Sequence, residues 1–171
     1  LEEQMLSLPN GVYDGEIILK NKDNLKSDEL FRATQKVVRK DGEKKGLDFY
    51  IFDTLTIGEF KSGKSKRTYE QRRNILDAIV EPVTHHLNNV SVLRVMYCGD
   101  DKDVIPTYAS TVEAKGFEGV MVNTAFGLYQ TKRVSDLLKV KSMKTADLLV
   151  VSVERAIDGQ FKDLLSRVNV E

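Results

Sequence analysis

FEGVMVNTAFGLYQTKRVSDLLKVK, residues 117–141, is the stretch that decides how this chain is interpreted. Its two ends, residues 117–123 and 136–141, are short strand-like runs. Because side chains alternate between the faces of a strand, Lys139 and Lys141 share one face and Val140 points to the core. Two neighbouring ammonium groups repel each other, so they favour a bound anion, and phosphate is the commonest candidate.

Glu118 opens the first of these predicted strands. A carboxylate beside a phosphate site is commonly a Mg²⁺ ligand, because Mg²⁺ prefers one or two carboxylates plus substrate phosphate oxygens. The alternative is a half-buried hairpin whose charges are solvated, since charged residues on a strand face are ordinary. Between the strands lie an aromatic residue, Tyr129, and a basic pair, Lys132 and Arg133.

The bulk composition describes a globular protein with one main core. The 171 residues are 41% hydrophobic and 30% charged, which is typical of a folded domain. The 26 basic and 26 acidic residues give a formal net charge of zero, so any nucleic-acid surface must be local. Cys98 is the only cysteine, which rules out an internal disulfide and favours the cytoplasm. We find no signal peptide and no apolar run of membrane-spanning length, so we expect no membrane partner.

Apolar periodicity along the rest of the chain predicts strands mixed with helices. The predicted strands are residues 11–20, 47–55, 90–97 and 148–153, with a last strand-like run at 167–171. The predicted helices are residues 28–40 with Ser27 as N-cap, residues 69–80 after a capping box of Thr68 and Gln71, and residues 106–115.

Asp14 and Glu16 share one face of the predicted strand 11–20 and are separated by Gly15. Two acidic side chains on one face are costly if they are buried without partners. They therefore predict solvent, a cation or a polar ligand group on that face.

The strongest local basic patch lies in residues 61–73, which hold six basic residues and one acid. Residues 58–67 are rich in glycine, serine and lysine and predict a flexible loop. Such a loop can follow a nucleic-acid backbone, because phosphate contacts position a protein without reading sequence. The alternative is a mobile, solvated loop. The candidate residues are Lys61, Lys64, Lys66 and Arg67, with Lys132, Arg133 and Lys144 as a second possible surface.

Four stretches occur in an order typical of one enzyme family. YDGEII at 13–18, FYIFDTL at 49–55, FEGVMVN at 117–123 and LLKVK at 137–141 resemble motifs III, IIIa, IV and V of ATP-dependent DNA ligases. Each motif alone is weak, but their order on predicted strands is specific, and the likeness is greatest to the compact phage type. The resemblance covers nearly the whole chain. It implies an α+β fold: an antiparallel-sheet, ATP-grasp-like adenylation domain at residues 1–145, and the beginning of an OB-fold barrel at residues 146–171.

The resemblance also implies which residues bind the nucleotide. In the family, the motif III glutamate lies near the ribose, and Glu16 occupies that place. An aromatic residue of motif IIIa stacks on adenine. We assign this role to Phe52, and leave Phe49 and Tyr50 open as alternatives because the strand register is not fixed by the sequence.

For the phosphates, the resemblance assigns Lys139 and Lys141 to neutralising the α-phosphate of ATP and AMP, and Glu118 to the Mg²⁺ site. Such a cage stabilises the charge that develops during nucleotidyl transfer. The predicted DNA contacts are the six basic residues Lys61, Lys64, Lys66, Arg67, Lys132 and Arg133.

The family seals nicks in duplex DNA through a lysyl-AMP, then a DNA-adenylate, then attack by the 3′-hydroxyl. We therefore expect nicked double-stranded DNA as partner, a monomer, and the cytoplasm of a bacterial or phage-infected cell. One alternative is an mRNA capping guanylyltransferase or RNA ligase of the same superfamily. Another is a non-catalytic nucleic-acid-binding module.

One departure from the family concerns the nucleophile, a lysine in a K-x-D-G motif ahead of motif III. Residues 1–171 contain no such motif there, and the nearest imitation is RKDG at 39–42. Its lysine has the wrong spacing, sits at a predicted helix end and follows motif III, so we reject Lys40. We expect a piece of a longer ligase, with an incomplete OB domain, that does not form a covalent adenylate by itself.

Overall fold

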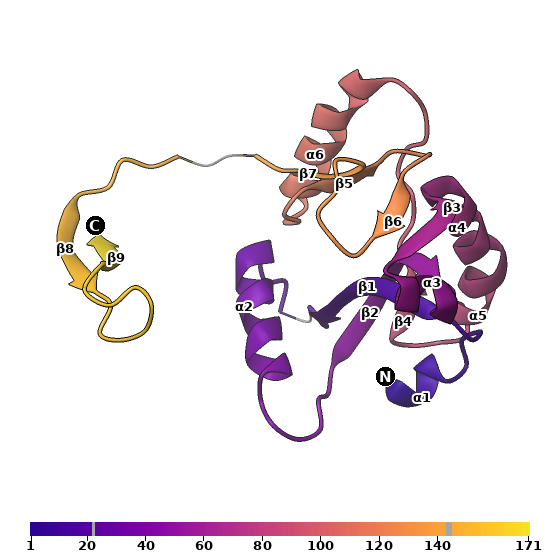
Figure 1. Cartoon of the computed structure of the whole chain (residues 1–171), viewed down its shortest axis with the longest axis horizontal. Coiled ribbons are helices and arrows are strands. Elements are labelled where there is room, and N and C mark those ends of the chain that lie inside the picture. Colours follow the sequence, from indigo (N-terminus) through magenta and orange to yellow (C-terminus); the bar gives the residue numbers. More distant parts are fainter. Residues whose placement is uncertain (22, 143–144) are drawn as a thin grey trace.

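The computed structural model describes residues 1–21, 23–142 and 145–171. Figure 1 shows helices and short sheets mixed along the chain, as expected for the α+β class. None of the described helices is long and apolar enough to cross a membrane. The helices are α1 (Glu2–Met5), α2 (Ser27–Val38), α3 (Ile57–Ser62), α4 (Tyr69–Ile75), the π-helical segment η1 (Leu76–Val80), α5 (Glu81–Thr84), the 3₁₀ turn η2 (Lys102–Val104) and α6 (Ile105–Ala114). The strands are β1 (Val12–Leu19), β2 (Leu47–Leu55), β3 (Lys64–Thr68), β4 (Val90–Val92), β5 (Val120–Asn123), β6 (Leu128–Gln130), β7 (Leu137–Val140), β8 (Val150–Arg155) and β9 (Leu165–Val170).

The main sheet has three strands in the order β1–β2–β4. β2 is antiparallel to β1 and parallel to β4, so the predicted antiparallel sheet is a mixed one. Ile51 and Val92 are register partners on its core face, and Leu76 and Val80 of η1 belong to the same buried cluster. This apolar contact fixes the helical run α4–η1–α5 against the sheet.

Gly15 of β1 admits an aromatic ring into this core. A Cβ built on Gly15 would lie 2.5 Å from the ring of Phe49 and 2.5 Å from the carbonyl oxygen of Tyr50. Only glycine leaves room for that close approach. Phe49 packs against the core cluster as a result, and the opposite face of the sheet carries Glu16 and Tyr50.

The predicted loop at residues 58–67 is wrong, because helix α3 and strand β3 occupy most of it. Thr56 caps α3: its hydroxyl accepts from Glu59 N at 3.2 Å, and its own N–H donates to the Glu59 carboxylate at 2.8 Å. Gly63 ends the helix with a φ of +72°. A helix of one to two turns has no visible periodicity, and the partner of β3 is β6, far along the sequence.

The other helix boundaries also differ from the prediction. Ser27 is the first residue of α2 and not its cap, because Lys26 is the N-cap and its N–H donates to Glu29 at 3.2 Å. The capping box of Thr68 and Gln71 is confirmed, but α4 ends at Ile75 and continues as a π-helical segment. A π-helical turn holds an extra residue, which shifts the face that a regular helix would bury.

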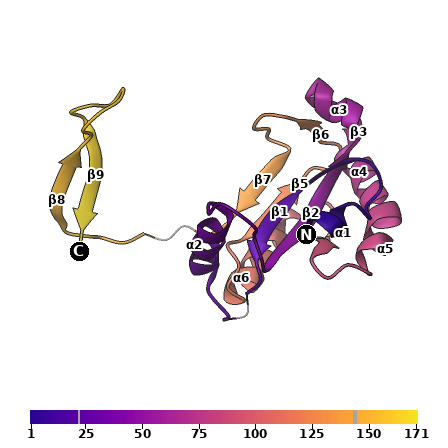
Figure 2. The same cartoon turned by 90° about the horizontal axis from the view of Figure 1, so that it is seen from below.

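The remaining strands form three two-stranded units. β3 pairs with β6, β5 pairs with β7 under helix α6, and β8 pairs with β9. Figures 1 and 2 both place the β8–β9 hairpin apart from the other elements. The strands predicted near the C-terminus are therefore present, while the division at residue 145 and the OB-fold assignment stay predictions.

Arg72 joins the β1–β2–β4 sheet to the β3–β6 ribbon. Its guanidinium forms a bidentate ion pair with Asp53 of β2, with Nε 2.8 Å from Oδ1 and Nη2 2.9 Å from Oδ2. Nη1 donates to the carbonyl oxygens of Arg67 at 2.6 Å and of Gly127 at 3.3 Å. The guanidinium also lies 5.8 Å from the ring centre of Tyr69 and 5.7 Å from that of Tyr129. Since the residue is only 3% exposed, this is a buried charge, and each of its three guanidinium nitrogens has a partner.

Replacing Arg72 by Met is expected to destabilise the fold by about 3–5 kcal/mol, because Asp53 would keep a buried charge without a cation. Urea unfolding followed by circular dichroism measures the loss. The control is Arg32→Met in helix α2, whose ion pair with Asp28 spans one exposed helical turn. Such a pair contributes about 0.3–0.5 kcal/mol. Equal losses in the two variants would contradict a special structural role for Arg72.

Candidate functional site

The structure brings Glu118, Lys139 and Lys141 together, as the sequence predicts. The Nζ atom of Lys139 lies 2.8 Å from one carboxylate oxygen of Glu118, and that of Lys141 lies 3.1 Å from the other. All three side chains are about half exposed, at 45%, 53% and 52% for Lys139, Lys141 and Glu118. The cluster is therefore open to a ligand from solvent.

The register of β5 and β7 explains this geometry. Met121 pairs with Lys139, and continuing the register two residues places Gly119 opposite Lys141. Gly119 has a φ of +151°, and a Cβ there would lie 2.2 Å from the carbonyl oxygen of Val140. Glycine is thus required where the chain enters β5, and the close approach carries Glu118 to both ammonium groups. Val140 is half-buried on the opposite face, and α6 packs against both strands.

Glu118 is itself the anion that the two lysines hold. Hydrogen bonds from Lys139 first and Lys141 second keep the pKa of Glu118 below its ordinary value of 4.5. A phosphate entering the cluster would attract the same ammonium groups and free the carboxylate oxygens. One carboxylate beside a phosphate fits the way proteins hold Mg²⁺. Across the described residues no group of three or more acidic, histidine or cysteine side chains is placed to form a metal cage by itself.

Ser142 fixes the end of β7, a contact that the sequence did not reveal. Its N–H donates to one carboxylate oxygen of Glu113 at 2.6 Å, and its hydroxyl donates to the other at 2.5 Å. Glu113 belongs to α6, so this clamp ties the residue after Lys141 to the helix behind the sheet. The only available signal was a serine after the lysine pair, which is too common to be informative.

A second group of candidate residues lies on the face of the main sheet opposite the core. Glu16 of β1, Tyr50 of β2 and Ser91 of β4 are aligned as direct register partners across the three strands. Burial, and then the nearby Asp48 carboxylate, raises the pKa of Tyr50. The sequence predicts Glu16 and leaves Tyr50 open, but it gives no signal for Ser91. The alignment of β4 in the sheet could not be read from local sequence.

Phe52 occupies an irregular place in the same strand. Asp14 pairs with Asp53 and Gly15 pairs with Ile51, so Phe52 is the extra residue of a β-bulge. A bulge bends the strand and re-aims the side chain that it carries. Phe52 therefore stays a candidate for stacking, whereas Phe49 is held in the core.

Tyr129 links the β1–β2 face to the paired strands β3 and β6. Its hydroxyl donates to Asp14 Oδ2 at 3.1 Å. Burial, followed by the Asp14 carboxylate, raises the pKa of Tyr129 to about 12. In the ranges that the structure describes, no hydrogen bond or ion pair joins Glu16 directly to Glu118, Lys139 or Lys141. In that part of the chain, the two groups of candidate residues therefore make no direct polar contact with each other through these side chains.

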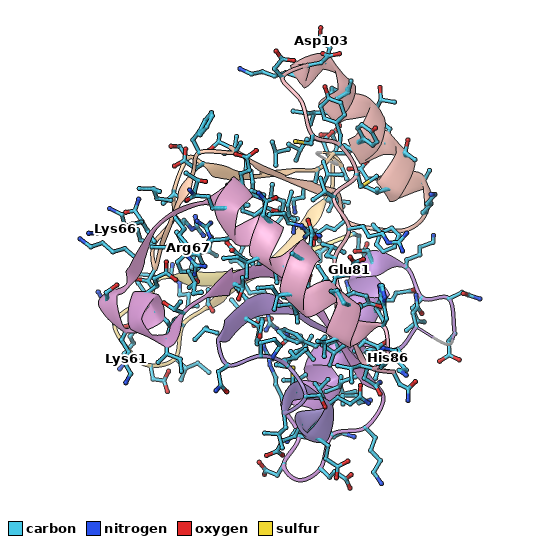
Figure 3. All side chains as sticks on the ribbon, turned by 90° about the vertical axis from the view of Figure 1, so that its right-hand side faces the viewer. Lys61, Lys66, Arg67, Glu81, His86 and Asp103 are labelled. Carbon is cyan, nitrogen blue, oxygen red and sulfur yellow. The ribbon has the colours of Figure 1, made fainter. Side chains whose placement is uncertain are left out.

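The predicted DNA-contacting residues divide into two kinds. Arg67 is partly buried and bound to Glu59, with Nε 2.8 Å from Oε1, and this contact holds the pKa of Glu59 well below its usual range. The others are exposed: Lys61, Lys64, Lys66, Lys132 and Arg133. Figure 3 shows Lys61 and Lys66 projecting outward on the same side of the molecule. Lys144 lies outside the described residues.

Strand pairing joins the two basic segments that the sequence presented as alternatives. Lys64 of β3 is the register partner of Gln130 of β6, and Thr131 N donates to Gly63 O at 3.2 Å. Lys132 and Arg133 follow directly. The two segments therefore lie side by side, and we call their exposed basic residues the basic ribbon: Lys61, Lys64, Lys66, Lys132 and Arg133.

Replacing Lys139 by Met should raise the pKa of Glu118 toward 4.5, and replacing Lys141 should raise it by less, because Lys139 is the larger cause of the shift. A ¹³C NMR titration of the Glu118 carboxyl carbon measures both effects. Replacement of Lys36, an exposed lysine of α2, is the control and should leave the titration unchanged. An identical titration in all three variants would mean that the ion pairs do not form in solution.

Comparison with known proteins identifies the type of domain. The model of the ATP-dependent DNA ligase domain matches residues 3–141. A solved structure named Pmar-Lig_PreS3 is 25% identical, with a TM-score of 0.68 over 95% of this chain. A structure from a study of DNA binding by Lig E DNA ligases is 19% identical, with a TM-score of 0.72 over 98% of this chain. The Chlorella virus DNA ligase-adenylate is 23% identical, with a TM-score of 0.54 over 99% of this chain.

This chain covers only 37% of the first of these structures and 60% of each of the other two. No curated protein matches it significantly. The structural likenesses support the fold, and the match over residues 3–141 supplies the family.

Proposed function

This chain belongs to the family of ATP-dependent DNA ligase domains, and from that premise we propose that it binds the nucleotide in an enzyme that seals nicks in duplex DNA. The observation that carries the proposal is the cluster of Lys139 and Lys141 around Glu118. It offers two cations and one acid on an open strand face, as a nucleoside triphosphate and its metal require. The family match favours this reading over a capping enzyme, an RNA ligase or a non-catalytic module.

In this proposal the face of the main sheet opposite the core receives the nucleoside. Glu16 accepts a hydrogen bond from the ribose, and Phe52 stacks on the adenine. Tyr50, the register partner of Glu16, lies beside them. The support is that Glu16 and Tyr50 lie on the face opposite the core while Phe49 packs into it.

Lys139 and Lys141 would bind the α-phosphate once the nucleotide enters. Their ammonium groups would turn from Glu118 to the phosphate oxygens, and the freed carboxylate would help to hold Mg²⁺. The metal supplies Lewis-acid neutralisation of phosphate charge when bound. Glu113 holds Ser142 and so keeps the end of β7, and with it Lys141, in place.

In the proposed reaction a lysine amine attacks the α-phosphorus, a P–N bond forms, and the bond to the β-phosphate oxygen breaks to release pyrophosphate. The two lysines stabilise the charge on the non-bridging oxygens. The resemblance places the nucleophile in a K-x-D-G motif that residues 1–171 do not supply. AMP then passes to a DNA 5′-phosphate, and the 3′-hydroxyl displaces it. We keep the monomeric state and the cytoplasmic location as proposals, the latter supported by the lone cysteine.

In an enzyme that carries the nucleophilic lysine, Lys139→Ala and Lys141→Ala should each slow adenylyl transfer by roughly 10²–10³-fold, the usual effect of removing one preorganised charge contact. Single-turnover transfer of labelled AMP measures the rate. Glu118→Ala should also weaken the dependence of the rate on Mg²⁺. Near-normal rates in both lysine variants would mean that Lys139 and Lys141 are only charged surface residues of this segment and have no role in the transfer.

We assign DNA binding to the basic ribbon. Its five side chains come from two segments that pair through β3 and β6, so they present cations along one continuous surface. This explains how a chain of zero net charge could bind a polyanion. Arg67 is bound to Glu59 and is therefore not counted among the exposed residues of this surface.

Replacing the five residues of the basic ribbon by Gln should weaken binding of nicked duplex at low salt. Each lost phosphate contact should lower the slope of log K against log salt by about 0.9. ATP binding should be unchanged. The control is Lys44→Gln with Lys45→Gln, in the connection between α2 and β2 on the other side of the molecule from the ribbon (Figure 1). An unchanged slope in the variant of the basic ribbon would mean that DNA binds to another surface of the protein.

A further inference from the structure

We propose that Arg72 is a positioning residue that fixes the aim of Phe52 by holding the β-bulge in β2. The inference rests on the proposed function in one respect, since it is that function which gives Phe52 the adenine base. The chain of contacts runs from Arg72 through the Asp53 carboxylate to the backbone that carries Phe52.

Because Phe52 lies in the bulge, the direction of its side chain depends on the local contacts that hold the bulge. On either side of it, Ile51 and Asp53 have register partners in β1, and Phe52 has none. A regular strand dictates where each side chain points, but a bulged residue depends on whatever fixes the bulge. Phe52 is half-buried, so part of its ring remains available to a ligand.

Asp53 supplies that support through its carboxylate. Oδ1 accepts a hydrogen bond from the N–H of Thr54 at 2.8 Å, in a buried environment. Bulges disrupt the hydrogen-bond ladder locally, and a buried N–H group needs a partner. The side chain of Asp53 therefore supplies a hydrogen-bond acceptor to the backbone beside the bulge. The orientation of its carboxylate then fixes the orientation of the neighbouring peptide groups.

Arg72 fixes the orientation of Asp53. Its fork contacts both carboxylate oxygens, which leaves the carboxylate no freedom to rotate. The guanidinium is itself held by the carbonyl oxygens of Arg67 and Gly127. A lysine at this position would keep the charge but lose the planar fork.

The expected effect is selective for the base. Glu16 and Tyr50 pair in the regular part of the ladder, and Lys139 and Lys141 lie on another sheet. Loosening the bulge should therefore weaken base stacking while leaving phosphate binding intact.

The first test reports on Phe52 without any nucleotide. The full chain carries 4-fluorophenylalanine at position 52, and ¹⁹F NMR compares Arg72→Lys and Asp53→Asn with the unmodified background and with the control Arg73→Lys. We expect a shifted or broadened resonance in the first two variants and no change in the control. Circular dichroism identifies which variants fold, and the two variants perturb the contact from opposite sides, so either one suffices. An unchanged resonance in a folded variant overturns the proposal.

The second test is a double-mutant cycle on nucleotide affinity, with 1,N⁶-etheno-ATP and tripolyphosphate as probes. Arg72→Lys should weaken etheno-ATP binding roughly 5- to 160-fold, the range for loss of one base–aromatic stack. In a Phe52→Leu background the same substitution should have less than about a twofold effect, and it should not change tripolyphosphate affinity. Additive effects, or equal losses for both probes, overturn the positioning role. Absence of etheno-ATP binding to the unmodified chain would instead overturn the proposed function, and the ¹⁹F result would still decide the bulge.

Discussion

The buried ion pair between Arg72 and Asp53 is the contact on which the arrangement of this domain depends. Burying two charges is unfavourable unless the geometry is excellent and further hydrogen bonds satisfy the remaining donors. Here the fork is bidentate, and the third guanidinium nitrogen reaches two carbonyl oxygens. Those carbonyls belong to β3 and to the turn before β6, while Asp53 belongs to β2. Burial of this charge is therefore favourable only when all three segments are in place. The ion pair thus favours the correctly folded arrangement of these segments over others.

The same physics sorts the basic residues of 61–73 by type. The three arginines are all paired: Arg67 with Glu59, Arg72 with Asp53 and Arg73 with Asp77. The three lysines of that segment are exposed, and the structure records no ion pair for them within its described ranges. A guanidinium is weakly hydrated and forms directed forks, whereas an ammonium is a strongly hydrated point charge. Arginine thus forms the contacts that hold these segments together, and the lysines are left exposed.

Features of this molecule that depend on residues close in the sequence could be predicted, and features that depend on contacts between distant residues could not. Strand alternation predicts that Lys139 and Lys141 share a face, and the resemblance adds Glu118, but only the structure shows that Glu118 pairs with both lysines. Helix α3 was missed because its six residues show no period, and β3 was missed because β6 lies some sixty positions away. Arg72 was counted in a solvated basic patch, since its partner Asp53 lies 19 residues upstream in another element. The aim of Phe52 was beyond prediction because a bulge has no sequence pattern of its own.

The electrostatics of the candidate site point to ligands, not to pH, as the agents that rearrange it. Tyr129 donates to Asp14 as a neutral phenol, and its pKa of about 12 keeps that proton in place well above neutrality. Glu118 has a pKa held below its ordinary value, so it stays ionised well below neutrality. Neither group changes charge across the neutral range. In the function proposed above, an entering phosphate must compete with a half-exposed carboxylate for two lysines. Because that carboxylate is then released beside the phosphate, anion binding and metal binding at this cluster should favour each other.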